Sequence, residues 1–263
     1  MSVATSHRFP PGTFTPAPQP AHPAAMLGAQ TWLELKLLLR NGEQLLLTMF
    51  IPITLLIGLT VLPFEELGHD HAARLLKLVP GVMMVAVMST AFTGQAIAVG
   101  FDRRYGALKR LGATPLPRWG IVAGKSAAVL IVVVAQAAIL GLLGLALCWQ
   151  PPLAGLAWGA LVIALGTVTF AALGLLLGGT LRAEIVLALA NILWFVMLGA
   201  ASLVFTTSVP EGVRNTVRLI PSGALASALE QATRLSADWF SIVVLVVWAG
   251  VGAVLAARFF RFS

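Results

Sequence analysis

Long uncharged apolar runs constrain this chain more than any other feature of its sequence. Each run is close to the roughly twenty residues that a helix needs to cross a hydrocarbon core about 30 Å thick. The runs are rich in Leu, Ala, Val and Gly and do not alternate apolar with polar residues, which favours helices over a β-barrel. We therefore predict an all-α integral membrane protein with six transmembrane helices, at about residues 44–62, 78–100, 126–149, 156–181, 185–207 and 239–257.

The overall composition excludes a soluble domain. Hydrophobic residues make up 59% and charged residues 10% of the 263 residues, and the mean hydropathy is +0.93. In a soluble domain about a quarter of the residues are charged. The net charge of +7 does not indicate a nucleic-acid partner, because Lys and Arg cluster in segments that border the apolar runs. The only cysteine, Cys148, permits no intramolecular disulfide and no cysteine-based metal cluster.

Two different segments precede the first span. Residues 1–25 are rich in proline and contain no apolar core, so they are predicted to form a disordered cytoplasmic tail. Residues 26–43 are amphipathic, which predicts a helix in the membrane interface; a charged extension of the first span is the alternative. The apolar side of this helix carries Trp32, Leu33, Leu37 and Leu38, and its polar side carries Lys36, Arg40 and Glu43.

The distribution of Lys and Arg predicts the orientation of the chain. Six spans place both termini on one side, and with the termini inside, the cytoplasmic segments hold twelve Lys and Arg residues against five in the outer loops. The positive-inside rule therefore favours cytoplasmic termini and a cytoplasmic loop between the second and third spans. Residues 208–238 are too charged to cross, since each charged group costs roughly 2.5–3.5 kcal/mol at mid-bilayer.

The sequence offers little chemistry for catalysis or metal binding. The spans contain no paired carboxylates and no histidine cluster, so neither a proton relay nor an intramembrane catalytic centre is predicted. The run His69-Asp70-His71 is interpreted as a solvated loop and not as a metal site. Residues 120–126 look like a phosphate-binding loop, but three residues separate the two glycines where the motif needs four. Any ATP use must therefore come from a partner.

Polar and small residues inside the spans have two interpretations each. The polar residues either line a substrate path or form hydrogen bonds between helices, and the sequence favours neither. Two glycine pairs, 155/159 and 174/178, have a spacing that lets helix backbones approach closely, and packing within the chain is favoured over a contact between copies. The candidate path residues are Ser89, Thr90, Thr93, Gln95 and Asn191, and Gln136 has the same character.

The most basic segment, Phe101–Lys125, holds six of the seventeen Lys and Arg residues. Gly106 precedes a short predicted helix that has Leu108 and Leu111 on one side. The run Thr114-Pro115-Leu116-Pro117 then forces an extended turn, because each proline biases the residue before it away from the helical region. A short rigid helix held near the membrane by a proline turn has a shape suited to docking into a groove.

The run DRRYGALKRLGATPLPR, from Asp102 to Arg118, and the later Gly124-Lys125 resemble the signature loop of ABC-2 type export permeases. These are the membrane subunits of ATP-binding-cassette exporters of drugs, polysaccharides and lipids. The chain departs from the family at Ala107, where Thr is common. The amphipathic N-terminal helix, the six spans and the long outer segment before the last span fit the same family.

The resemblance implies a permease that pairs with a second permease copy, as a homodimer or a closely related heterodimer. It also implies two copies of a separate nucleotide-binding ATPase subunit, which hold the ATP and Mg, and export of a drug-like, lipid or glycan substrate across the bacterial cytoplasmic membrane. Residues 208–238 would form short re-entrant helices. The residues implied to couple to the ATPase are Asp102, Arg103, Arg104, Tyr105, Gly106, Leu108, Lys109, Arg110, Leu111, Thr114 and Pro115 in the loop, and Trp32, Glu34, Lys36 and Arg40 on the interface helix.

Two other classes of protein are weaker alternatives. An ion-coupled secondary transporter or channel without an ATPase partner normally needs an ionisable or unwound site near mid-bilayer, and the spans carry no acid. A membrane enzyme acting on lipids would need a constellation of catalytic carboxylates or histidines, for which the sequence gives no sign. The permease of an ATP-driven exporter is therefore the favoured function.

Overall fold

A computed structural model describes residues 21–61, 71–114, 116–206 and 210–260. These residues form α-helices, one π-helix and short connections, and no strand occurs among them. The predicted disordered tail lies outside the described residues as far as position 20. Residues 23–25 are helical, so the predicted tail boundary at residue 25 is wrong. A helix begins at Pro23 because the first turn needs no backbone N–H donor.

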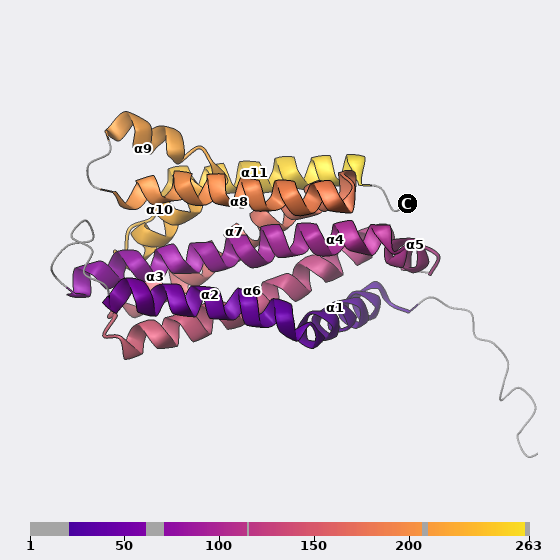
Figure 1. The fold of residues 1–263 in the computed structure, drawn as a ribbon, viewed down its shortest axis with the longest axis horizontal. Helices are drawn as coiled ribbons and strands as arrows, with labels where there is room; N and C mark the ends of the chain where they lie inside the picture. The colour runs from indigo at the N-terminus through magenta and orange to yellow at the C-terminus, as the bar shows by residue number, and fades with distance from the viewer. Residues whose placement is uncertain (1–20, 62–70, 115, 207–209, 261–263) are drawn as a thin grey trace, which may run out of the picture.

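The long helices lie side by side along the longest axis of the molecule (Figure 1). Within the described residues, five helical segments are long and apolar enough to cross a membrane, and a shorter apolar segment covers Thr48–Val61. The elements are α1 (Pro23–Arg40), α2 (Gly42–Val61), α3 (His71–Val87), the π-helix η2 (Met88–Gly94), α4 (Gln95–Arg104), α5 (Ala107–Gly112), α6 (Arg118–Ala146), α7 (Leu153–Thr180), α8 (Ala183–Phe205), α9 (Glu211–Val217), α10 (Pro221–Thr233) and α11 (Trp239–Phe259).

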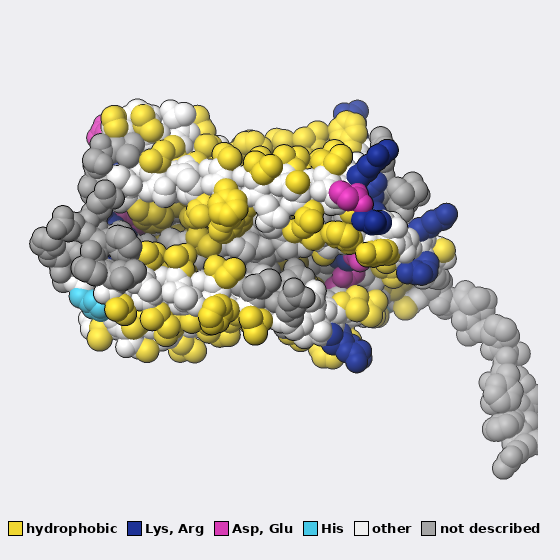
Figure 2. Space-filling model, in the orientation of Figure 1, with side chains coloured by type: hydrophobic (Ala, Val, Ile, Leu, Met, Phe, Trp, Pro, Cys, Tyr) yellow, Lys and Arg dark blue, Asp and Glu magenta, His cyan; other side chains and the backbone are white. Residues whose placement is uncertain are grey.

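The two ends of the bundle differ in charge. In Figure 2, Lys and Arg side chains gather at the end where α1, α5 and the C-terminal turn of α11 lie, which we call the basic end. The start of α3 and helix α9 lie at the other end, which we call the opposite end. Large apolar side chains on the long sides face outward, among them Phe195 and Val254 with 66% and 64% of their surface exposed. Such a surface is typical of helices surrounded by lipid.

The second predicted span is one continuous helical segment made of α3, η2 and α4, and it is longer than residues 78–100. Helix α7 approaches this segment closely at the π-helix and at the start of α4. A Cβ atom added at Gly174 would meet the carbonyl oxygen of Phe92 at 2.8 Å, and one at Gly178 would meet the carbonyl of Ala96. The spacing of these glycines is therefore explained by packing within the chain.

The third helix begins earlier than predicted. Helix α6 begins at Arg118 and not at Ser126, and α4 continues as far as Arg104. The predicted loop 101–125 is therefore largely helical. The physical reason is that Lys125 is buried inside α6 and is neutralised by two carboxylates, so its charge does not interrupt the helix. The first and the last three predicted spans agree with α2, α7, α8 and α11 within a few residues.

Two short helices, α9 and α10, occupy the described part of the polar segment before the last helix. Helix α10 is buried among α3, α7, α8 and α11. Small residues allow this close packing: a Cβ atom at Gly155 of α7 would meet the carbonyl oxygen of Ala232 in α10 at 2.7 Å. The opposite end of the bundle is therefore filled by a helix too short to cross a membrane.

Candidate functional site

A left-handed glycine sets the direction of the short helix at the basic end. Gly106 has φ +70° and ψ 15°, a conformation that residues with a Cβ rarely adopt. Its N–H donates to the carbonyl of Arg103 at 3.0 Å, and its own carbonyl accepts from the N–H of Arg110 at 3.1 Å. The turn at Gly106 thus ends α4 and starts α5 without leaving these backbone groups unpaired.

Helix α5 is anchored to the bundle by one buried side chain. Leu108 is fully buried in a cluster with Val99 of α4, Ile121 of α6, Leu175 of α7 and Ala256 of α11. Burying a leucine side chain contributes roughly 1.5–3 kcal/mol. Helix α5 is therefore joined to a buried cluster that contains residues of four long helical segments.

The other side of α5 is exposed and basic. Lys109 and Arg110 are both exposed, and Tyr105 has 67% of its surface exposed. Thr114 closes the C-terminal end of the helix, since its hydroxyl donates to the carbonyl of Leu111 at 2.6 Å. Pro115 lies outside the described residues. The described surface of the short helix combines positive charge, an aromatic ring and a fixed backbone.

Asp102 and Arg103, which were predicted to belong to the docking surface, turn inward. The Arg103 guanidinium donates to the carbonyls of Gly178 and Leu181 at 3.1 and 3.0 Å, at the C-terminal end of α7. Cations at this position bind the unpaired carbonyls of a helix and interact favourably with its dipole. Its exposed neighbour Arg104 forms an ion pair with Glu184 at the start of α8. These two arginines connect α4 to α7 and α8.

A buried ion cluster, which we call the Lys125 cluster, joins three segments of the basic end. The Lys125 ammonium of α6 lies 2.8 Å from Oε2 of Glu34 in α1 and 2.7 Å from Oδ2 of Asp102 in α4. The amide of Gln30 donates to the other oxygen of Glu34 at 2.7 Å. Only 9% of the Lys125 side chain and 8% of the Glu34 side chain are exposed, and such charges are tolerated inside a protein when each is paired. Helix α1 lies close against α6 here: a Cβ at Gly124 would meet Cγ of Gln30 at 2.5 Å.

Sequence reasoning named Glu34, Asp102 and Lys125 separately and did not pair them. The available signal was the placement of Lys125 one residue before an uncharged apolar run, and of Glu34 among apolar residues. A buried lysine that keeps its charge needs an acid partner.

Helix α1 presents its apolar side outward. Its buried residues are Gln30 and Glu34, whereas Trp32, Leu33 and Leu37 have between 43% and 66% of their surface exposed. The exposed apolar surface is the pattern of a helix that lies in the membrane interface. The helix ends at Arg40 and α2 begins at Gly42, so α1 is not an extension of the first span. Lys36 and Arg40 are exposed near this end.

Four of the five candidate path residues lie on the segment from η2 to α4, and two of these bond to side chains of other helices. The hydroxyl of Thr90 donates to the side chain of Gln136 in α6 at 3.0 Å. Ser89 accepts from the indole of Trp194 in α8 at 3.1 Å. The fifth, Asn191, is exposed on α8 and bonds within its own helix.

The other two candidates are not fully paired. Gln95 donates to the carbonyl of Ala171 in α7 at 3.5 Å. The Gln95 carbonyl oxygen and the Thr93 hydroxyl are buried without a hydrogen-bond partner in the described part of the chain. The polar residues thus gather around the π-helix, and Asn191 lies apart from them.

A second ion cluster, which we call the Asp238 cluster, was not predicted. Asp238 precedes α11 and pairs with Arg218, which follows α9. The hydroxyls of Ser227 in α10 and Ser241 in α11 donate to Oδ2 of Asp238 at 2.6 and 2.7 Å. Burial alone raises the pKa of Asp238, but hydrogen bonds from Ser227 and Ser241 and the charge of Arg218 outweigh it and hold the pKa below its usual value.

The sequence model of the ABC-2 type transporter family matches residues 27–232, from α1 into α10. The chain belongs to the ABC-2 type transporter family. No curated protein matches it.

The membrane subunits of ABC-2 type transporters are permeases and do not catalyse a reaction themselves. The match includes both α5 and α1. Together with the long apolar helices, it identifies a multi-pass membrane protein of the ABC permease class. Among the described residues, no group of three or more His, Cys, Asp or Glu side chains is placed to hold a metal ion.

Proposed function

We propose that this chain is the permease subunit of an exporter driven by a separate ATP-hydrolysing subunit. The observation that carries the proposal is helix α5, whose Leu108 side is buried in the bundle while its Lys109 and Arg110 side is exposed. ATP and Mg bind to the partner, and α5 with the exposed part of α1 forms the surface that contacts it. The alternative of a transporter without an ATPase has no observation in its favour.

The positive charge of this surface indicates that the partner's surface is acidic. Lys109, Arg110 and Arg104 on the loop and Lys36 and Arg40 on α1 are exposed at the basic end. An acidic groove on the ATPase subunit complements them, and complementary charge directs both encounter and orientation. Tyr105, 67% exposed, supplies an aromatic side chain of the kind that is enriched in the buried centres of interfaces.

The connections of α5 explain how a movement reaches the membrane. Leu108 belongs to a buried cluster with residues of four helices, Arg103 binds the end of α7, and Lys125 links α1 and α4 to α6. The basic end therefore responds to the ATPase as one unit. Since a partner shifts an equilibrium only by binding two states with different affinity, the ATPase must contact α5 differently in its open and closed forms.

The complete transporter contains two copies of this chain, or this chain and a close relative, with two ATPase subunits. Helix α2 also crosses the membrane and brings the number of spans to six, because its 20 residues extend about 30 Å, the thickness of a hydrocarbon core. The basic end and both termini face the cytoplasm of a bacterial cell, in accord with the positive-inside rule. Helix α10 enters the outer leaflet as a re-entrant helix, and the cargo is a drug-like molecule, a lipid or a glycan.

The decisive experiment reverses the exposed charge of α5. The chain is tagged, purified from its native membranes with its bound proteins, and assayed for vanadate-sensitive ATP hydrolysis. We expect the wild-type complex to hydrolyse ATP and the variant Lys109→Glu/Arg110→Glu to lose about tenfold or more of the bound ATPase. Neither side chain is buried, so the variant keeps the elution profile of the folded permease.

A matched control reverses one exposed charge at the opposite end. Arg234 makes only a surface ion pair with Glu230 of its own helix, so Arg234→Glu should retain the ATPase. The proposal fails if the wild-type chain purifies without ATP hydrolysis, or if the double reversal at α5 retains as much ATPase as the control.

A further inference from the structure

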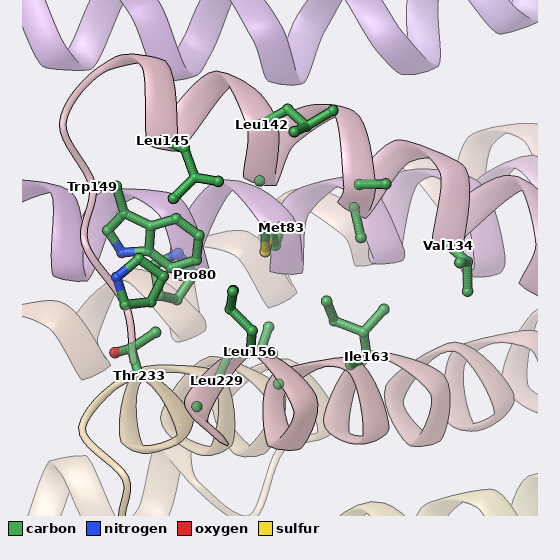
Figure 3. Close-up of a pocket in the computed structure, with 17 residues that line it drawn as sticks. Pro80, Met83, Val134, Leu142, Leu145, Trp149, Leu156, Ile163, Leu229 and Thr233 are labelled. Atoms are coloured by element: carbon green, nitrogen blue, oxygen red, sulfur yellow. The ribbon is translucent and has the colours of Figure 1, made fainter. Parts of the chain in front are cut away.

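A cavity of about 440 Å³ lies between α6 and α7 in the half of the bundle toward the opposite end (Figure 3). Residues of α3 and α10 close it from behind. Binding pockets for small molecules commonly enclose about 300–1,000 Å³. The lining is almost entirely apolar and consists of Pro80, Met83, Val134, Ala137, Ala138, Gly141, Leu142, Leu145, Trp149, Pro151, Gly155, Leu156, Gly159, Ala160, Ile163, Leu229 and Thr233.

The mouth of the cavity opens sideways, between two helices that cross the membrane. Ala138 and Leu142 of α6 and Ala160 of α7 line the cavity and are themselves exposed, whereas Ile163 and Leu229 are buried. The short side chains of Ala138 and Ala160 keep the mouth open. A molecule from the bilayer therefore has direct access.

Water does not fill an apolar cavity of this kind. Apolar cavities of about 150 Å³ remain dry, because a buried water needs two to four polar partners. The hydroxyl of Thr233 already donates to the carbonyl of Glu230 at 2.7 Å. An empty cavity of this size is costly to a folded protein, because its lining lacks contacts on one side.

The length of the cavity matches one leaflet of a bilayer. Its lining in α6 extends from Val134 to Leu145, which is about 17 Å at 1.5 Å per residue. Half of a hydrocarbon core is about 15 Å thick. The cavity thus has the depth of the acyl region in the leaflet that faces the opposite end.

One aromatic residue lies at the end of the cavity nearest the membrane surface. Trp149 is 3% exposed, and its indole N–H is itself buried, so the cavity is lined by the ring of Trp149 and not by its donor. Figure 3 shows its ring beside Leu145 at one end of the cavity. The turn at Cys148, with φ 71°, folds Trp149 back so that its backbone N–H donates to the carbonyl of Gly144 at 2.8 Å. Tryptophan is enriched at the depth of lipid head groups.

We propose that this cavity holds one acyl chain of a bilayer phospholipid, which enters between α6 and α7 and lies with its glycerol end beside the Trp149 ring. The apolar walls bind the chain. The site is separate from the basic end and does not depend on the proposed ATPase coupling.

The test uses a phospholipid with a photoreactive diazirine in one acyl chain, reconstituted with the full chain in nanodiscs. We expect labelled peptides to map to Val134–Leu145 and Leu156–Ile163. The variant Ala160→Phe fills the mouth and should lower this labelling about tenfold, the loss expected when roughly two methylene groups are displaced from an apolar site. The control is Ala157→Phe, since Ala157 is exposed on the same helix and does not line the cavity.

A second mouth variant keeps the proposal falsifiable. Ala138→Phe closes the mouth from α6 if Ala160→Phe does not fold. Labelling spread evenly over all exposed apolar helices, or unchanged in both mouth variants, overturns the proposal.

A second copy of the chain covering the mouth is a separate outcome. In a Cys148→Ser background, Ala138→Cys would then form a disulfide between two copies in the membrane, and that result would also overturn the lipid proposal.

Discussion

The Lys125 cluster and the Asp238 cluster each compensate a buried charge, at the two ends of the bundle, but with different kinds of partner. Each places a buried charge where three segments meet. At the basic end a cation lies between two carboxylates, and one neutral side chain, that of Gln30, bonds to the group through Glu34. At the opposite end one carboxylate is shared between an arginine and two serine hydroxyls. The first cluster depends on its central charge much more than the second.

The two clusters should respond differently when their central charge is removed. Without the charge of Lys125, the carboxylates of Glu34 in α1 and Asp102 in α4 would repel each other. In the Asp238 cluster, two hydroxyls compensate part of the charge of the carboxylate, and Arg218 also bonds to Ser241. The first arrangement fits the coupling role that we propose for the basic end.

The largest expected effect is that of Lys125→Met. The variant keeps the length of the side chain but leaves Glu34 and Asp102 without their cation, which should lower the free energy of unfolding by about 3–5 kcal/mol. The measurement is thermal or denaturant unfolding in detergent. Adding Glu34→Gln and Asp102→Asn removes the unpaired charges and should restore most of the stability. Equal stability of Lys125→Met and wild type would show that the Lys125 cluster does not depend on its central charge.

A smaller effect is expected for Asp238→Asn, about 2 kcal/mol, because hydrogen bonds to a charged acceptor weaken while the hydroxyls keep a partner. The pKa of Asp238 is lowered from about 3.8 in the folded protein, so the carboxylate stabilises the fold at neutral pH. This stabilisation is lost as the pH falls below about 4.

The pH dependence of unfolding tests this assignment. The difference in stability between wild type and Asp238→Asn should be constant near neutral pH and shrink only in the acid range, as the carboxyl group becomes protonated in both states. A difference that stays constant down to about pH 3 would show that the charge of Asp238 contributes nothing.

The smallest expected effect distinguishes the two carboxylates of the Lys125 cluster. Glu34 and Asp102 lie at nearly equal distances from Lys125, but 8% of the Glu34 side chain is exposed against 35% of the Asp102 side chain. Water compensates a partly exposed charge, so Glu34→Gln should destabilise the protein by about 1 kcal/mol more than Asp102→Asn. The reverse order in unfolding experiments would mean that α4, and not α1, depends most on Lys125.

The sequence predicted the fold class and the bounds of four of the six spans closely, because uncharged apolar runs of sufficient length leave the backbone no alternative to a helix in lipid. It was less successful where charge lies inside a helix. Lys125 was interpreted as the end of a loop, because an isolated lysine is costly in a span, and its partners are 91 and 23 residues away in the chain. Local patterns do not contain such long-range pairs.

The candidate site was predicted unevenly for the same reason. Gly106, Leu108 and Leu111 were recognised from a local pattern, and the structure gives Gly106 a left-handed turn and buries Leu108. Arg103 was grouped with the exposed arginines, although it binds the end of α7. Charge along the sequence does not indicate which arginine finds a helix terminus. The Asp238 cluster and the cavity behind Trp149 had no sequence signal.

By itself the sequence determined that this protein lies in a membrane, which segments are helical, and where its basic segment and short helix lie, because hydropathy, glycine and proline act over a few residues. Only the tertiary structure decided which charges are buried, which residues of α5 face outward, and where the bundle leaves a cavity. These features depend on contacts between helices far apart in the chain, where the cost of burying a charge or leaving a space is set by what the neighbouring helix supplies.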